Sequence, residues 1–73
     1  MDATSLDATV KTSLTLVRAK LEKALRIATA AEVCSVSGRT RKAIEVARGL
    51  DEIVSEVNTL LNTTNIISRL GQS

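Results

Sequence analysis

The stretch that decides the fold is residues 43–61, AIEVARGLDEIVSEVNTLL, where apolar residues recur at alternating intervals of four and three. Such a heptad repeat aligns apolar side chains along one side of an α-helix. The predicted seam is Ala43, Ala47, Leu50, Val54, Val57 and Leu61. A second apolar column runs beside it at a spacing of seven: Val46, Ile53, Leu60 and Ile67. Two adjacent columns make a broad apolar face, which is typical of a helix in a four-helix bundle.

The residues before this stretch show the same periodicity. The predicted seam of the first half is Val10, Leu14, Val17, Leu21, Ala24, Ala28 and Ala31. We expect a helix over about residues 5–34, because this spacing persists through three heptads. The hydroxyl of Thr4 or Ser5 can cap its first turn.

The two halves are separated by the polar segment Ser35-Val-Ser-Gly-Arg-Thr40. Gly38 can adopt the left-handed conformation that ends a helix, and Ser37 or Thr40 can cap the next one. We therefore expect a turn over about residues 35–39 and a second long helix over about 40–62. A connection this short makes the two helices antiparallel neighbours.

A softer break is predicted at Asn62-Thr-Thr-Asn65, because these side chains compete with the helical backbone for hydrogen bonds. The apolar residues Ile66, Ile67 and Leu70 follow it. They form either a short third helix over about residues 64–70 or a frayed continuation of the second helix.

Chain length favours a dimer. A single domain spanning residues 1–73 buries only roughly 60% of the surface of its unfolded chain. One cysteine and no histidine exclude an internal disulfide and a Cys/His zinc site. We therefore expect an all-α helical hairpin that dimerises into a four-helix bundle. The residues expected at the dimer interface are Leu50, Ile53, Val54, Val57, Leu60 and Leu61.

Catalysis is not expected. Without His or Tyr, acid–base chemistry would depend on carboxylates or lysines. Asp51 and Glu52 are adjacent, so on a helix they do not face one another. We interpret Cys34 as a small packing residue, since no activating base is in view. No enzyme activity, cofactor or metal site is predicted.

The charges are unevenly distributed. Residues 11–48 carry nine Lys or Arg against three Glu, whereas the remainder carries one Arg against five acids. A basic segment of this kind suits an anionic partner. Arg39, Arg41 and Lys42 lie at the start of the second helix, where the helix dipole disfavours positive charge. This arrangement indicates that the basic residues serve binding more than stability.

One polar column recurs every seven residues and faces away from the apolar seam. It consists of Arg41, Arg48, Ser55, Asn62 and Arg69. Further basic candidates for binding are Lys11, Arg18, Arg26, Arg39 and Lys42. The alternative is a solvated surface with ion pairs between helical neighbours. The pairs expected in that case are Glu22–Arg26, Arg41–Glu45 and Glu45–Arg48.

A long helical surface rich in Arg, Ser and Asn fits double-stranded RNA. Duplex RNA is recognised by shape, through phosphates and 2′-hydroxyls over about 16 base pairs. Binding of this kind needs no aromatic side chains, and the chain has none. Their absence argues against single-stranded nucleic acid, whose binding depends on base stacking.

The end of the chain resembles the RNA-silencing suppressors of nodaviruses. The similarity lies in Leu60-Leu61, four polar residues, Ile66-Ile67 and then Leu70, with a looser echo in Leu14-Thr-Leu-Val17, Leu21 and Leu25. The resemblance implies a helical hairpin that dimerises into a four-helix bundle and lies along double-stranded RNA. It also implies that Arg41, Arg48 and Ser55 contact the RNA.

The leading hypothesis is thus a homodimer that binds double-stranded RNA and suppresses RNA silencing by sequestering it. The alternative is a helical protein-interaction module, such as a secretion chaperone subunit or an assembly or regulatory adaptor, whose apolar face binds a partner helix. The apolar runs are too short to span a bilayer, so no membrane partner is expected. An unpaired cysteine agrees with a cytoplasmic location, the host cytoplasm if the protein is viral.

Overall fold

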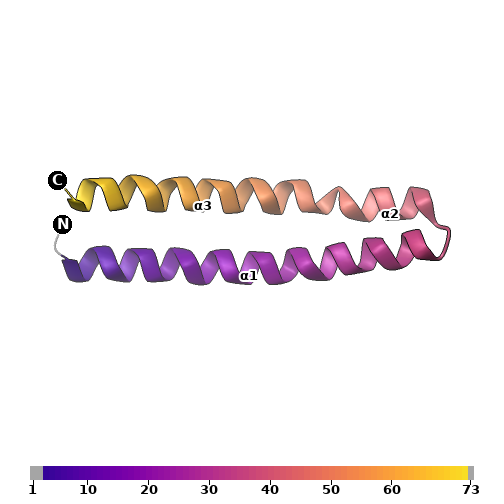
Figure 1. Ribbon diagram of the computed structural model, residues 1–73, viewed down its shortest axis with the longest axis horizontal. Coiled ribbons are helices and arrows are strands. Elements are labelled where there is room, and N and C mark those ends of the chain that lie inside the picture. The colour runs from indigo at the N-terminus through magenta and orange to yellow at the C-terminus, as the bar shows by residue number, and fades with distance from the viewer. Residues whose placement is uncertain (1–2, 73) are drawn as a thin grey trace.

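The computed structural model describes residues 3–72, and the side chains of residues 5–70 within that range. The chain forms a helical hairpin (Figure 1). Helix α1, Ala3–Val36, runs in one direction, and α2, Thr40–Ala47, and α3, Gly49–Gln72, return beside it. The hairpin is a rod of 54 × 15 × 11 Å. The predicted all-α hairpin is confirmed, and its dimerisation stays a prediction.

Helix α1 ends in a turn centred on Gly38, whose φ is 83°. The Gly38 N–H donates to the carbonyl of Ser35 (3.0 Å), and the Arg39 N–H donates to the carbonyl of Cys34 (2.8 Å). These two bonds form a Schellman motif, which pairs carbonyls that the end of a helix leaves free. The prediction that Gly38 ends the first helix in a left-handed conformation is confirmed.

The predicted caps are wrong at this turn. The Ser37 hydroxyl donates to the Val33 carbonyl (2.8 Å), so it closes α1 and does not begin α2. Thr40 is the first residue of α2, and Arg39 holds the N-cap position without a side-chain hydrogen bond. At the other end, α1 begins before Thr4 and includes it, so the predicted capping start lies inside the helix.

The predicted break at residues 62–65 is also wrong, because α3 continues through them. The Thr63 and Thr64 hydroxyls donate to the carbonyls four residues earlier, Thr59 (2.9 Å) and Leu60 (2.8 Å). The side chains are thus satisfied without opening the helix. Of the two alternatives for the end of the chain, the structure has the continuation.

The second half is interrupted instead at Arg48, between α2 and α3. Its N–H donates to the Ile44 carbonyl (3.1 Å), while its own carbonyl accepts from the Asp51 N–H three residues ahead (3.2 Å). This tighter turn contains Gly49, and a glycine inside a helix costs about 1 kcal/mol relative to alanine. Gly49 was the available sequence signal for the interruption.

The core is a narrow seam between α1 and the returning helices. Ile53, Val17 and Val57 are buried, with 6–8% exposure, and Ala24, Ile27 and Leu60 pack against them. Along the second half, buried and half-buried positions recur at intervals of three and four. The members of this series are Ala43, Val46, Leu50, Ile53, Val57, Leu60, Thr64 and Ile67. Ala47, Glu56 and Ser68 are also half-buried and flank the series.

The seam of α1 differs from the prediction by one column. Its buried and half-buried members are Leu6, Val10, Ser13, Val17, Lys20, Ala24, Ile27, Ala31 and Cys34. Leu14 and Leu21 are about half exposed and lie beside the seam. The predicted second-half seam is corrected in the same way, since Val54 and Leu61 are exposed while the column containing Ile53 is buried. In each half of the hairpin, one of two adjacent columns packs between the helices, and the other column remains largely exposed.

Candidate nucleic-acid interface

The arginine column, Arg41, Arg48, Ser55, Asn62 and Arg69, lies on the outer side of α2 and α3. All five residues are exposed. The seam keeps its spacing on both sides of Arg48, and Arg48 itself has right-handed helical dihedrals. The column therefore continues across the interruption. Seven-residue spacing holds it opposite the buried seam, where a large flat ligand has access.

No arginine of the column forms an ion pair within residues 5–70. The three pairs expected for a merely solvated surface are absent. Glu22 pairs with Arg18 (2.6 Å) and not with Arg26. Glu45 pairs with Lys42 (3.7 Å) and with neither Arg41 nor Arg48. The positive charge of the column therefore remains available to an external anion.

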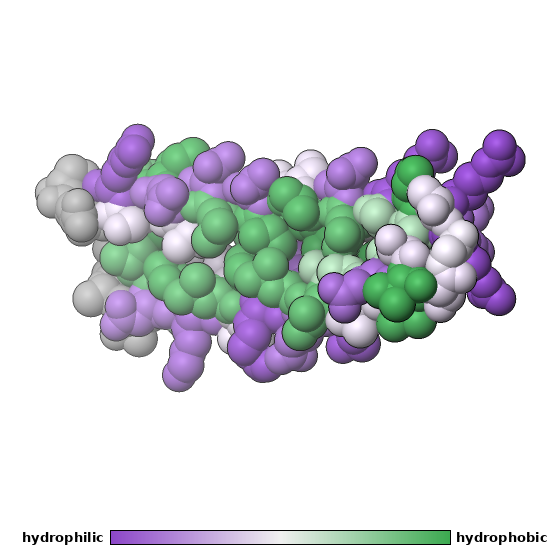
Figure 2. All heavy atoms as spheres, turned by 45° about the vertical axis from the view of Figure 1, so that its right-hand side comes forward, coloured by the Kyte–Doolittle hydropathy of each residue, from purple (hydrophilic) through white to green (hydrophobic). Residues whose placement is uncertain are grey.

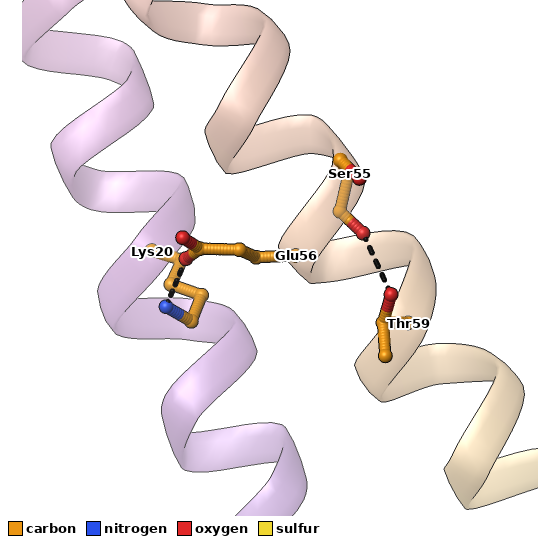
Figure 3. Close-up of polar contacts among 4 residues, drawn as sticks. All are labelled: Lys20, Ser55, Glu56 and Thr59. Carbon is orange, nitrogen blue, oxygen red and sulfur yellow. Dashed lines mark hydrogen bonds and ion pairs between the residues drawn. The ribbon is translucent and has the colours of Figure 1, made fainter.

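Neighbouring acids are partly neutralised by lysines. Glu45 has Lys42, and Glu56 has Lys20 (Figure 3). Glu52 is exposed, next to the position of Ile53 in the chain. Glu45 and Glu56 thus carry a local counter-charge, which reduces their repulsion of phosphate. Asp51 and Glu52, three and four residues after Arg48, form no ion pair within residues 5–70.

The other predicted basic residues do not gather on this surface. Lys11 and Arg18 lie on α1, each next to the apolar column that contains Leu14 and Leu21. Arg26 lies around the opposite edge of α1. All three are exposed. The structure therefore brings together the column on α2 and α3 but leaves these residues of α1 apart from it.

Two further basic residues lie at the hairpin turn. Arg39 and Lys42 are exposed and close to Arg41, the first member of the column. They extend the positive surface to the end of the rod. Lys42 also forms the ion pair with Glu45, so its charge is partly neutralised.

The ion pair between Lys20 and Glu56 joins the two long helices and was not predicted (Figure 3). Lys20 occupies a seam position, and its side chain is 32% exposed. The hydrogen bond and the charge of Lys20 lower the pKa of Glu56 below its usual value. Its sequence signal was the column Ser13, Lys20, Ile27 and Cys34, which is less apolar than the neighbouring column Leu14, Leu21 and Ala28.

A second surface is the apolar face, formed by side chains that the seam leaves uncovered. Figure 2 shows hydrophobic side chains gathered in a band along both helices. Leu14, Leu21, Val54 and Leu61 are 39–51% exposed. The face comprises the exposed residues Leu14, Leu21, Leu25, Ala28, Ile44, Val54 and Leu61, together with the half-buried Ala47.

The register of the hairpin places these residues on one side. Lys20 contacts Glu56, and the side chain of Ile27 lies near Gly49. With this register, Leu21 lies level with Val54. Leu21 comes directly after Lys20 of the α1 seam, and Val54 comes directly after Ile53 of the α3 seam. In an antiparallel pair of helices, residues that directly follow the seam in this way lie on the same side of the pair.

The six residues predicted at a dimer interface fall into three groups. Ile53 and Val57 are buried inside the hairpin. Val54 and Leu61 belong to the open apolar face. Leu50 and Leu60 are half-buried. A second chain thus has direct access to Val54 and Leu61.

The described part of the chain offers little other chemistry. Residues 3–72 contain no group of three or more Cys, Asp or Glu side chains able to hold a metal ion. No helix in that range has the length and apolarity needed to cross a bilayer. Cys34 is half-buried at the end of the α1 seam, as a packing residue would be.

Comparisons with protein-family models, with curated proteins and with solved structures found no match to this chain. The functional assignment therefore rests on the two surfaces themselves.

Proposed function

We propose that the chain acts as a homodimer that binds double-stranded RNA without sequence preference and suppresses RNA silencing by sequestering the duplex. The observation that carries the proposal is the arginine column, which is exposed and has no internal ion pair within residues 5–70. The silencing role comes from the resemblance to nodavirus suppressors.

The length and chemistry of the column support this ligand. From Arg41 to Arg69 the chain advances about 42 Å at the helical rise. Duplex RNA presents phosphates and 2′-hydroxyls over a comparable length. Arginine guanidinium groups would bind phosphates, while Ser55 and Asn62 would reach sugar hydroxyls. None of these contacts reads a base, so no sequence preference is expected.

The test is binding of the full chain to a 20-base-pair RNA duplex, with a DNA duplex of the same sequence beside it. We expect preference for RNA and an affinity that falls steeply as salt rises. The variant Arg48→Glu should weaken RNA binding at least tenfold, because it replaces two phosphate contacts per dimer with repulsion. Lys23→Glu is the matched control, since it makes the same charge change on exposed α1 outside the column. Because Lys23 also attracts Glu56, both variants are compared under conditions in which circular dichroism shows them folded.

Equal affinity for RNA and DNA, or an equal loss of RNA affinity in Arg48→Glu and Lys23→Glu, would show that binding is only a general attraction between opposite charges. Absence of RNA binding at low salt would end the proposal.

The open apolar face favours a second candidate, a protein-interaction module that receives a partner's helix. Under that alternative, Arg48→Glu leaves partner binding nearly unchanged, and Leu21→Asp abolishes it. Arg48→Glu therefore separates the two functions, whereas Leu21→Asp disturbs both.

A further inference from the structure

We propose that the apolar face is the contact between two copies of this chain, packed with α1 antiparallel to the partner's α1 and α3 antiparallel to the partner's α3. The two-fold axis crosses the interface at the level of Leu21 and Val54, so each of these two residues meets its own copy in the partner. The inference rests on the proposed function, which requires a dimer. It adds which face of the hairpin forms the dimer contact, the relative direction of the two chains and the residues that lie opposite one another.

The first argument is side-chain size along the face. Leu14 and Leu61 are large and lie toward the open end of the hairpin, whereas Ala28 and Ala47 are small and lie toward the turn. Turning the second copy end for end brings large residues against small ones. Leu14 then meets the partner's Ala28, and Leu61 meets the partner's Ala47. Close packing of a bundle core requires this alternation.

The parallel arrangement lacks this fit. With both turns at the same end, α1 would face the partner's α3. Leu14 would then meet the partner's Leu61, and Ala28 would meet the partner's Ala47. The interface would be overfilled at one end and hollow at the other, and both faults destabilise a core.

The second argument is charge at the edge of the face. Lys11 and Glu32 lie on the same edge of α1, three heptads apart, and both are exposed. Neither forms an ion pair within residues 5–70. About an axis at Leu21, Lys11 comes level with the partner's Glu32. The symmetry repeats the pair at the other end. In the parallel arrangement Glu32 would instead lie beside the partner's Ile44.

The same edge explains Arg18. About the proposed axis it lies level with the partner's Leu25, whose side chain is 67% exposed in one hairpin. The aliphatic stem of an arginine can cover such a leucine while the guanidinium stays in water. The Arg18–Glu22 pair holds the charged end on the outer side of α1.

The arrangement also has a consequence for the arginine column. Two antiparallel α3 helices place the two columns side by side. Arg41 then lies next to the partner's Arg69, and Arg48 lies next to the partner's Asn62. The dimer thus presents a symmetric surface with arginines at both ends and Ser55 at its centre.

The test is the association state of the full chain without RNA, measured by sedimentation equilibrium. The wild type should be a dimer. Lys11→Glu and Glu32→Lys should each weaken dimerisation about tenfold, because each change breaks two pairs. The double variant should restore the wild-type association. Arg26→Glu, a charge reversal on the opposite edge of α1, is the control and should leave association unchanged.

Crosslinking tests the axis separately. In a Cys34→Ser background, Leu21→Cys should form a disulfide-linked dimer on mild oxidation with copper phenanthroline. Ala28→Cys in the same background should not, because Ala28 lies level with the partner's Leu14.

A monomeric wild type would overturn the inference and leave the face to a different protein. A dimer in which the charge swap fails to restore association, or in which Ala28→Cys crosslinks as well as Leu21→Cys, would overturn the register. Since RNA is absent from these assays, a dimer that does not bind RNA contradicts the proposed function alone.

Discussion

The apolar face and the arginine column lie on different sides of α2 and α3, and periodicity predicted the column fully but the apolar face only in part. The column was expected to face away from the core, and all its members are exposed. Leu14, Leu21 and Val54 were predicted as members of the seam, yet they are about half exposed. For Val54 this exposure agrees with its other predicted role, at a dimer interface. The exposure of a polar column opposite the core follows directly from its spacing. Where two apolar columns lie side by side, spacing alone does not show which one is buried between the helices of the hairpin.

The difference between neighbouring apolar columns can be measured at Ile53 and Val54. Ile53→Ala should lower the free energy of unfolding by about 2–4 kcal/mol, because it leaves a cavity in the narrow seam. Val54→Ala should cost much less in dilute protein and more as protein concentration rises. Urea unfolding at two protein concentrations distinguishes them.

Equal effects of the two substitutions at low concentration would mean that both columns lie in the hairpin core. The comparison between the buried and open columns would then fail.

A smaller change in stability is expected at Gly49, which lies at the interruption between α2 and α3. An added Cβ would lie 3.7 Å from Cδ1 of Ile27, an ordinary contact. Gly49→Ala should therefore raise the free energy of unfolding by about 1 kcal/mol through helix propensity. Thermal unfolding followed by circular dichroism measures this.

Gly38→Ala is the matched control. Because Gly38 has a positive φ, alanine there should destabilise the fold. A loss of stability for Gly49→Ala would show that the interruption is required for the hairpin.

The smallest effect concerns the ion pair inside the hairpin. Lys20 lowers the pKa of Glu56 from its usual 4.5, first by its hydrogen bond and then by its charge. A carboxyl group with a lowered folded pKa stabilises the fold above its unfolded pKa. This stabilisation is lost as pH falls through the folded pKa. Stability should therefore drop on acidification below about pH 4.5, and Glu56→Gln and Lys20→Met should each reduce that drop.

Urea unfolding at a series of pH values below neutrality measures the dependence. An acid response that is identical in the wild type and both variants would contradict the role of the pair.

The sequence was sufficient for the hairpin and its turn because heptad spacing and Gly38 are local signals. It was insufficient for the seam, because Lys20 and Ser13 interrupt the buried column of α1 with polar residues. The break expected at residues 62–65 failed for a different reason. Threonine hydroxyls can bond to the preceding turn and stay in the helix, as Thr63 and Thr64 do. Composition does not distinguish the two outcomes.

The exposed character of the candidate site was predictable from the spacing of Arg41, Arg48 and Arg69. Its freedom from ion pairs was not, because Glu45 has several helical neighbours within reach. Only the structure shows that it pairs with Lys42. The choice among nearby partners depends on side-chain geometry, which residue spacing leaves open.

The most direct test of the account is the salt dependence of RNA affinity in the wild type and in Arg48→Ala. In a double-logarithmic plot against salt, the slope should become shallower by about two for Arg48→Ala, one for each copy in the dimer. The control Lys23→Ala should keep the wild-type slope. An unchanged slope for Arg48→Ala, or the same change for both variants, would contradict the assignment of the arginine column as the RNA-binding surface.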